Sequence, residues 1–334
     1  MQNNKTLNYA DGILQAFTYL LENHKEVFVF GQGLWSPWYV GSTMKDLDKK
    51  FGVERVIDSP VSEVAVTGAA IGASVCGYRP IVVHPRVDFM ILAIDQIVSQ
   101  AAKWSSMFGG QVHPAVTIRG IVNRGGEQGA QHSQALHAWF AHVPGLRVVM
   151  PATARDARDL LIASVLCDDP VLYIDDRWLY EWEEEDPGIQ LLNLSEVGPH
   201  VLKNGNDITI VAASFSTKLA MDAAKTLEEE GISVEVVDLR VINPIHWDVI
   251  LESVQKTGRL LAVDGGWQSC GLAGEIIAGV MEHVPLAVMK ASPKRLTLTN
   301  APAPTSKVLE EIYYTQPSQI ISAVKEMIGS KVHV

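Results

Sequence analysis

Short apolar runs alternate with helix-like segments along the whole chain, and this alternation restricts the fold more than any other feature of the sequence. Residues 27–30, 80–83 and 171–174 are typical runs, apolar at almost every position. Strands of this kind are buried on both faces, as in a parallel sheet covered by helices. The alternation therefore predicts an α/β protein built on parallel sheets.

The same order of elements recurs in both halves of the chain. In the first half we expect strands at residues 27–30, 55–58, 80–83, 115–119, 147–151 and 171–174, helices at 13–21, 63–76, 93–104 and 154–166, and a glycine-rich loop at 120–129. In the second half we expect strands at 207–213, 233–238, 259–264 and 287–290, and helices at 217–231, 245–256 and 271–283. Gly231 is a typical helix stop, because glycine readily adopts the left-handed conformation.

The length of the chain points to two domains. Its 334 residues exceed the roughly 250–300 residues at which a single core usually divides. The acidic stretch at residues 180–188 ends in Pro187 and Gly188, and such polar segments are typical of domain boundaries. We therefore expect this stretch to be a linker between domains at residues 1–187 and 188–334.

Composition and charge exclude several classes of protein. Hydrophobic residues make up 47% and charged residues 19% of the chain, which excludes a disordered or fibrous protein. With 27 Lys and Arg against 38 Asp and Glu, the net charge is −11, so we expect no binding to nucleic acid. The apolar runs are too short to span a membrane, and the N-terminal residues lack the features of a signal peptide.

The cysteines indicate the redox environment. Cys76, Cys167 and Cys270 lie far apart and show no CxxC spacing, which disfavours a zinc site or a disulfide framework. This usage fits a reducing compartment, so we expect a cytoplasmic protein.

The segment from Asp58 to Glu63 precedes the expected helix at 63–76. A structural interpretation is sufficient for it: Ser62 has the residue type of a helix N-cap, and the helix dipole favours a carboxylate in the first turn. A functional interpretation is also open. Open α/β sheets bind ligands at the carboxyl ends of their strands, which is where this helix is expected to start.

Three other features have both structural and functional interpretations. His132, in Gln131-His132-Ser133-Gln134, is either a structural histidine or a proton shuttle, and the preceding loop lacks the P-loop pattern. Phe89 follows the strand at 80–83, where burial in the core is usual for a single phenylalanine. Residues 264–275 are rich in glycine but lack G-x-G-x-x-G spacing, which favours a tight turn from strand to helix over a dinucleotide site.

Many segments occur in the order in which one known family has them: residues 55–63, 68–73, 93–98, 107–111, 131–134, 137–146, 237–240, 243–244 and 258–260. On these segments the chain resembles the β subunit of the thiamine-diphosphate-dependent first component of 2-oxo acid dehydrogenase complexes. This family includes pyruvate, acetoin and branched-chain enzymes, and transketolase is a more distant relative. The resemblance covers nearly the whole chain.

The resemblance implies an architecture and partners. It implies a parallel-sheet pyrimidine-binding domain followed by a smaller α/β domain of the transketolase C-terminal type. Thiamine diphosphate would lie between this chain and a separate α subunit, in an α2β2 heterotetramer with a β–β dimer contact. The family's GDG motif for diphosphate and magnesium is not in this sequence, so magnesium is expected to be bound mainly by the α subunit.

The resemblance also implies roles for single residues. Glu63 matches the glutamate that hydrogen-bonds the cofactor's pyrimidine nitrogen and relays a proton. Phe89 matches the aromatic residue that packs on the pyrimidine, and His132 matches the histidine beside the reacting substrate. Some members of the family also bind a potassium ion, mainly through backbone carbonyls, at positions that match Val116, Ser164, Val165, Cys167 and Asp169.

The chain departs from the family before Phe89, where the family has an acidic residue followed by mainly apolar and aromatic ones. Here the run is Val83-His84-Pro85-Arg86-Val87-Asp88. One interpretation is a rearranged loop or a changed subunit contact. The other is a substrate more polar than pyruvate, because arginine is a natural partner of carboxylates and phosphates. On this interpretation His84 or Arg86, if directed towards the substrate channel, adds positive charge beside the substrate.

The expected function is that of a β subunit of a 2-oxo acid dehydrogenase. With its α subunit it would decarboxylate a small-molecule 2-oxo acid and pass the acyl group to a lipoyl acceptor, which makes a lipoyl acyltransferase core a further partner. Two alternatives stay open: a split transketolase-like enzyme acting on a polar or sugar substrate, and a noncatalytic scaffold subunit.

Overall fold

The computed structural model describes residues 6–329, and its described residues form two compact units. Unit 1 comprises the chain up to Arg124 together with Trp139–Val197 and Ile242–Pro244. Unit 2 comprises Gly125–Ala138, Gly198–Val241 and the chain from Ile245 onward. Part of the N-terminal stretch assessed for a signal peptide, residues 1–5, lies outside the described residues. The expected domain boundary at 187/188 stays a prediction.

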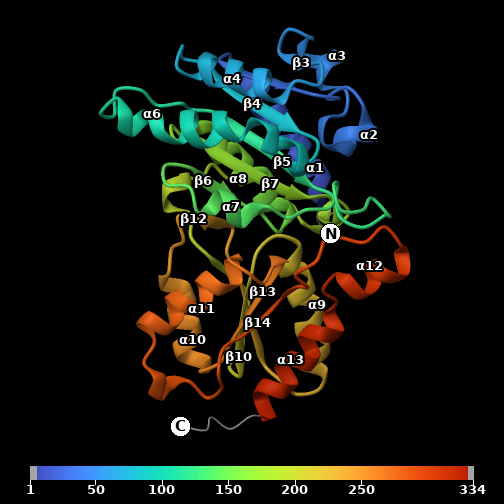
Figure 1. Cartoon of the computed structure of the whole chain (residues 1–334), viewed down its shortest axis with the longest axis vertical. Coiled ribbons are helices and arrows are strands. Elements are labelled where there is room, and N and C mark those ends of the chain that lie inside the picture. The colour runs from blue at the N-terminus through green and yellow to red at the C-terminus, as the bar shows by residue number, and fades with distance from the viewer. Residues whose placement is uncertain (1–5, 330–334) are drawn as a thin grey trace. The chain divides into compact units, whose positions relative to one another are not determined.

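Unit 1 is built on a seven-stranded sheet (Figure 1). In spatial order its strands are β12 (Val241–Asn243), β6 (Arg147–Val149), β7 (Val171–Asp176), β5 (Thr117–Val122), β4 (Arg79–His84), β2 (Val27–Gly31) and β3 (Val56–Asp58). Neighbours from β6 to β3 are parallel. The predicted parallel α/β fold is confirmed.

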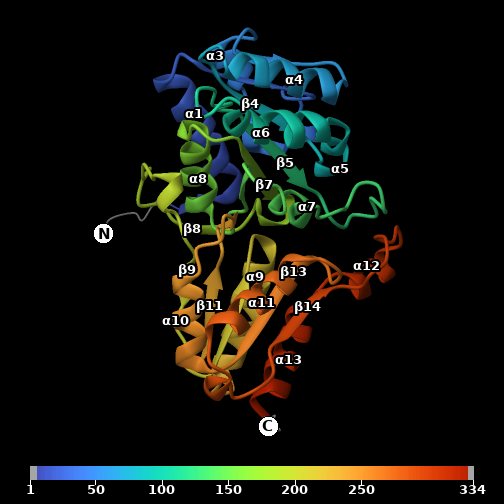
Figure 2. The ribbon, with the colours of Figure 1, turned by 60° about the vertical axis from the view of Figure 1, so that its left-hand side comes forward.

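Helices lie on both sides of this sheet, as Figure 2 shows. They are α1 (Tyr9–Asn23), α2 (Pro37–Val40), α3 (Leu47–Phe51), α4 (Glu63–Ser74), α5 (Val87–Met90), α6 (Ala102–Met107), α7 (His137–Ala141), which continues from unit 2, and α8 (Ala154–Leu166). The side chain of Asn8 caps α1 by accepting a hydrogen bond from the backbone N–H of Asp11 at 2.7 Å. Helix α8 has the predicted bounds.

Unit 2 contains a mixed five-stranded sheet. Its order is β14 (Lys294–Leu298), β13 (Leu260–Trp267), β10 (Ile208–Ala212), β11 (Val234–Asp238) and β9 (His200–Lys203), with β9 antiparallel to β11 and the other pairs parallel. Its helices are α9 (Phe215–Glu229), α10 (Asp248–Thr257), α11 (Leu272–His283), α12 (Lys307–Tyr313) and α13 (Pro317–Gly329). Apolar side chains of α9 and α13 pack with those of the central strands into one buried core.

Several expected elements differ in the structure. The helix expected at 93–104 is interrupted: a 3₁₀ turn, Ile91–Ala93, and a π-helix, Gln96–Ala101, precede α6. The hydrophobic period of a sequence does not distinguish these windings from an α-helix. The loop expected at 120–129 begins later, because Gly120 belongs to β5, where a side chain would press against Met90.

The prediction of a strand at residues 287–290 is wrong. Leu286–Val288 form a 3₁₀ turn after Pro285, and the strand is β14, whose first residues are Lys294 and Arg295. Since β14 is an edge strand, its polar residues remain accessible to solvent, and the sequence therefore lacks the apolar run of a buried strand.

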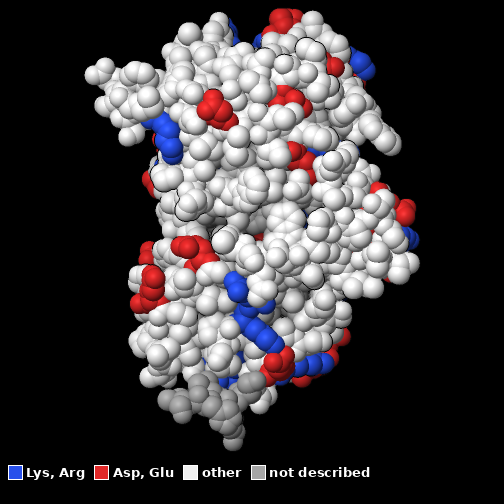
Figure 3. Space-filling view, in the orientation of Figure 1, with Lys and Arg blue, Asp and Glu red and all other residues white. Residues whose placement is uncertain are grey.

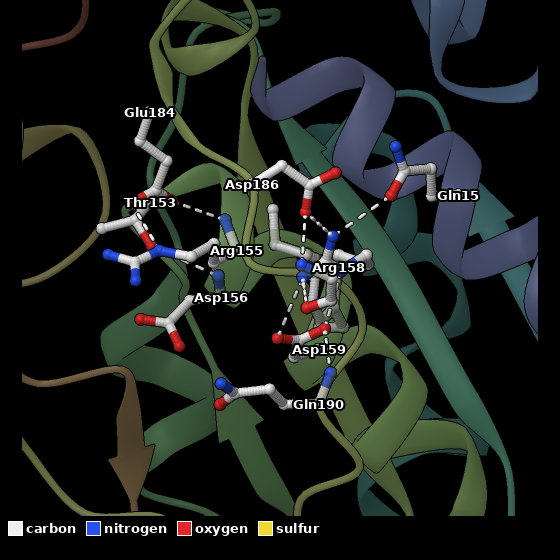
Figure 4. Close-up of polar contacts among 12 residues, drawn as sticks. Gln15, Thr153, Arg155, Asp156, Arg158, Asp159, Glu184, Asp186 and Gln190 are labelled. Atoms are coloured by element: carbon white, nitrogen blue, oxygen red, sulfur yellow. Dashed lines mark hydrogen bonds and ion pairs between the residues drawn. The ribbon is translucent and has the colours of Figure 1, made fainter. Parts of the chain in front are cut away.

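The acidic segment expected as a linker is folded onto unit 1. Glu183–Glu185 form β8, which pairs antiparallel with β1 (Thr6–Asn8). Figure 4 shows how the following residues are held: the buried Arg158 donates to Asp159 at 2.8 Å and to Asp186 at 2.6 Å. The backbone oxygen of Gly188 accepts a further hydrogen bond from Arg158. A guanidinium on α8 therefore pairs with Asp186, an acidic residue of the stretch that was expected to be a linker.

Candidate active site

Glu63 opens α4 immediately beyond the carboxyl end of β3, as the sequence predicted. Ser62 occupies the N-cap position, but its side chain makes no capping hydrogen bond; its backbone oxygen accepts from Val66 instead. The Glu63 carboxylate lies in the first turn, where the helix dipole favours negative charge, and it is half-buried. The structural interpretation of Ser62 as a side-chain cap is therefore not supported, and the interpretation of Glu63 as a ligand-binding residue stays open.

Glu63 lines a hollow at the carboxyl ends of three parallel strands, β2, β3 and β4. This shallow hollow is lined by Gly31, Gln32, Ser59, Pro60, Ser62, Glu63, Val66, Val83, His84 and Pro85. Gly31 allows β2 and β4 to approach, since a Cβ on it would lie 2.3 Å from the backbone oxygen of Val83. The hollow therefore combines one carboxylate with mainly apolar walls, at the sheet edge where α/β proteins bind ligands.

His84 closes the hollow on the side of β4. It is buried, and its Nε2 is hydrogen-bonded to Thr67 Oγ1 at 3.2 Å. Burial lowers the pKa of His84 to about 4, so the imidazole is neutral at pH 7. A neutral His84 leaves the expected positive charge beside the substrate to Arg86, and the role of both residues there stays a prediction. Thr67, which the sequence did not single out, lies one helical turn after Glu63, a spacing that could have identified it.

Arg86 and Phe89 follow the same strand on or next to α5. Arg86 is the half-buried N-cap residue of α5, and burial followed by the charge of Arg177 lowers its pKa, although an arginine still keeps its proton at neutral pH. Phe89 is 40% exposed and so does not have the core position that is usual for phenylalanine. Neither side chain is among those that line the hollow. Because His84 is neutral at pH 7, Arg86 is the residue that can supply the positive charge expected beside the substrate.

His132 lies in unit 2, in the segment Gly125–Ala138. The side chain is half-buried, and its backbone N–H donates to the oxygen of Gly129 at 3.3 Å. Its expected role beside the substrate stays a prediction.

The residues expected to bind potassium lie near the end of α8 and the start of β5 and β7. Arg79 donates to the backbone oxygens of Val165 at 3.0 Å and Cys167 at 2.8 Å, and Arg147 donates to Asp169 at 2.7 Å. Each carbonyl oxygen has two lone pairs, so a potassium ion would have to share them with Arg79. The sequence analysis missed Arg79, and potassium binding stays a prediction.

The rest of the described chain offers no alternative metal centre. Within residues 6–329, no group of at least three His, Cys, Asp or Glu side chains is arranged to hold a metal ion. None of the helices in that range has the length and apolar character of a segment that crosses a bilayer.

Comparison with known proteins identifies relatives of both units. Residues 5–181 match the family described as Transketolase, pyrimidine binding domain, and residues 199–320 match Transketolase, C-terminal domain. A curated relative, the acetoin:2,6-dichlorophenolindophenol oxidoreductase subunit beta of Cupriavidus necator, is 41% identical over 86% of this chain and 84% of its own length. The mitochondrial pyruvate dehydrogenase E1 component subunit beta of Caenorhabditis elegans is 34% identical over 97% of this chain and 93% of its own.

A solved structure has the same fold over nearly the whole chain. The structure titled "Split gene transketolase, inactive beta4 tetramer" superposes with a TM-score of 0.75, at 21% identity, over 98% of this chain and 99% of that one. At this identity the likeness shows the fold alone.

Proposed function

This chain belongs to the family of E1 β-like subunits of thiamine-diphosphate-dependent 2-oxo acid and acetoin dehydrogenases, and we propose from this premise that it forms the pyrimidine-binding half of a decarboxylating 2-oxo acid dehydrogenase. The observation that carries the proposal is the position of Glu63, a half-buried carboxylate at the start of α4 that lines the hollow beyond β2, β3 and β4. A complete α2β2 enzyme would then pass the acyl group to a lipoyl acceptor.

The pyrimidine ring of thiamine diphosphate would lie over the hollow beside Glu63 rather than inside it, because Phe89 is not among the residues that line the hollow. The Glu63 carboxyl would bind a ring nitrogen and hold or move a proton there. The exposed ring of Phe89 would pack on the pyrimidine face. When bound, the cofactor supplies a carbon nucleophile and an electron sink for decarboxylation.

Two histidines would have different tasks. His84 is neutral and tied to Thr67, so it can shape the wall beside Glu63 without adding charge. His132 would donate or guide a proton near the reacting substrate, a common task of histidine in catalysis. A noncatalytic scaffold would need neither Glu63 on a hollow nor an exposed Phe89, which disfavours that alternative.

The α subunit would complete the cofactor site. This sequence lacks the GDG motif, and no cluster of carboxylates replaces it within residues 6–329, so the diphosphate and magnesium would be bound mainly by the partner. Unit 1 exposes apolar side chains suited to subunit contacts, among them Val64, Leu92 and Met107. Figure 3 shows a largely uncharged face over this unit. A β–β contact, a lipoyl acyltransferase core and a cytoplasmic location complete the proposal.

Arg86 bears on the choice of substrate. As the charged side chain after β4, it would favour a 2-oxo acid with a second polar or anionic group. The same charge supports the second candidate, a split transketolase-like enzyme acting on a sugar phosphate or another polar ketose.

The test is to co-express the chain with an α subunit of the same family and to assay the purified complex with thiamine diphosphate and magnesium. A panel of 2-oxo acids, acetoin and ketoses is screened with an artificial electron acceptor, and a Glu63→Gln complex is the control. We expect oxidation of a 2-oxo acid that the control lacks. Ketol transfer between sugars without acceptor reduction would favour the second candidate, and no turnover by an assembled, cofactor-loaded complex would contradict both.

A further inference from the structure

The segment Gly125–Ala138, here called the His132 segment, follows β5 of unit 1 but packs within unit 2. Its first half is held by the C-terminal part of the chain. The N–H of Gly125 donates to the hydroxyl of Tyr314 at 3.3 Å, and the N–H of Glu127 donates to the Glu310 carboxylate at 2.9 Å. These contacts fix the beginning of the segment and leave open what fixes its end, beyond His132.

A buried hydrogen bond between a histidine and a carboxylate holds that end. His137 Nε2 lies 2.9 Å from Asp264 Oδ1, and the two side chains are 2% and 3% exposed. Burial by itself raises the pKa of Asp264, but His137 and the backbone N–H groups of Gly266 and Ala273 outweigh it, so that this pKa is lowered. Asp264 is therefore an ionised acceptor, and the hydrogen-bond network assigns the proton of His137 to Nε2.

The orientation of His137 depends on this one polar contact. Its other ring nitrogen, Nδ1, is buried and has no hydrogen-bond partner among the described residues. Gly266 makes the approach to Asp264 possible, since a Cβ on it would lie 3.1 Å from His137 Cε1. The glycines after Asp264 thus serve close packing rather than a dinucleotide.

We propose that His137 and Asp264 are a positioning pair that holds the His132 segment in its active conformation. Asp264 is anchored in β13 and also accepts from the N–H of Ala273 in α11. It therefore ties the segment to an interior strand of the unit 2 sheet and to α11. The order of the segment does not depend on any activity, whereas the effect on catalysis rests on the proposed function of His132.

Hydrogen–deuterium exchange of the full chain tests the proposal without substrate. In His137→Leu, which has similar volume but no donor, amides of residues 126–136 should exchange about 10- to 100-fold faster, the effect of losing one hydrogen bond to a buried charge. His137→Gln can still donate to Asp264 and should stay within about threefold of wild type. Amides of β10 report global opening, so the increase at residues 126–136 is measured against any increase at β10, and the local effect is the excess over it.

Thr217→Val is the matched control. It removes another buried hydrogen bond to a carboxylate in unit 2, from Thr217 Oγ1 to Asp238 at 2.9 Å, away from the His132 segment. Faster exchange of residues 126–136 in His137→Leu but not in Thr217→Val supports the proposal. Unchanged exchange in His137→Leu, or an equal increase in the control, overturns it. If His137→Leu does not fold, Asp264→Asn is measured by the same criteria.

Activity of the complex with the α subunit gives the second readout. His137→Leu should lower kcat on the order of 10- to 100-fold, as misplacement of a catalytic group does, with His137→Gln restoring it and thiamine diphosphate affinity unchanged. Loss of cofactor affinity with unchanged kcat contradicts a role for the pair in positioning His132. An enzyme without the proposed activity would refute that function and still leave the exchange result as a test of the pair.

Discussion

His84 Nε2 lies 3.2 Å from the hydroxyl of Thr67, which stands one helical turn beyond Glu63 on α4. Through this contact the end of β4 is tied to the helix that presents the candidate proton-relay group. The imidazole is buried, and burial lowers its pKa to about 4, so this histidine is neutral at pH 7. Protonation of His84 at low pH should therefore lower the free energy of unfolding of unit 1.

The first prediction concerns this pH dependence. The pKa of His84 is about 4 in the folded chain and about 6.5 in the unfolded chain. The unfolded state therefore binds more protons between these values, and the free energy of unfolding falls as the pH drops from about 6.5 to 4. His84 should account for about 3 kcal/mol of this loss at 1.36 kcal/mol per pKa unit.

Denaturant unfolding of wild type and His84→Gln from pH 7 to pH 4 measures this contribution. The substitution can keep a hydrogen bond to Thr67 but cannot titrate. We expect the wild-type curve to fall more steeply than that of the variant. Parallel curves would show that the imidazole is accessible to protons in the folded state.

The second prediction concerns Glu63. In Glu63→Gln the amide fills the same space but cannot relay a proton, so turnover of the α2β2 complex should fall about 10²- to 10⁴-fold. The melting temperature should change little, because Glu63 is only half-buried. Steady-state kinetics and thermal unfolding check the two statements, and near-normal turnover of the variant would remove Glu63 from the mechanism.

The third prediction concerns Arg158, which is buried against Asp159 and Asp186 (Figure 4). Arg158→Leu leaves carboxylates buried without their partner, so the free energy of unfolding should fall by about 3–5 kcal/mol. Arg155→Leu on the same helix is the control: Arg155 is 46% exposed in its pair with Glu184, and its loss should cost less than about 1 kcal/mol. Equal losses measured by urea denaturation would contradict the assignment.

The fourth prediction concerns cofactor binding by the separate chain. Since the diphosphate motif is missing, titration calorimetry with thiamine diphosphate and magnesium should detect no binding tighter than about 1 mM, whereas the complex with the α subunit should bind. Micromolar affinity of this chain by itself would contradict the proposal that the site is shared.

The fifth prediction concerns Arg86 as a specificity residue. A charged hydrogen bond to a carboxylate or phosphate corresponds to a preference of roughly 10- to 100-fold. We expect the complex to prefer a 2-oxo acid or ketose with a second polar group over pyruvate. Arg86→Leu should raise KM for that substrate and leave KM for pyruvate nearly unchanged. A preference for pyruvate in both proteins would make Arg86 a structural residue.

Much of the site could be predicted from local sequence, but its protonation and its contacts could not. Glu63 at the start of a helix beyond a short strand follows from residue type and order. The same reasoning could not foresee that His84 is buried, and the charge of a histidine depends on how completely it is buried. Similarly, the acidic stretch before residue 188 was expected to be a linker because of its charge. Its contact with Arg158 depends on the packing of α8, which the sequence does not reveal.

The sequence by itself determined the α/β alternation, the helix at 154–166, the stop at Gly231 and the resemblance to a family, since these depend on neighbours along the chain and on the order of motifs. The tertiary structure alone decided which distant groups meet. His137 and Asp264 are 127 residues apart, and Thr67 and His84 lie on different elements. Hydrophobic periodicity and capping act over a few residues, whereas burial and choice of partner arise only when strands and helices pack together.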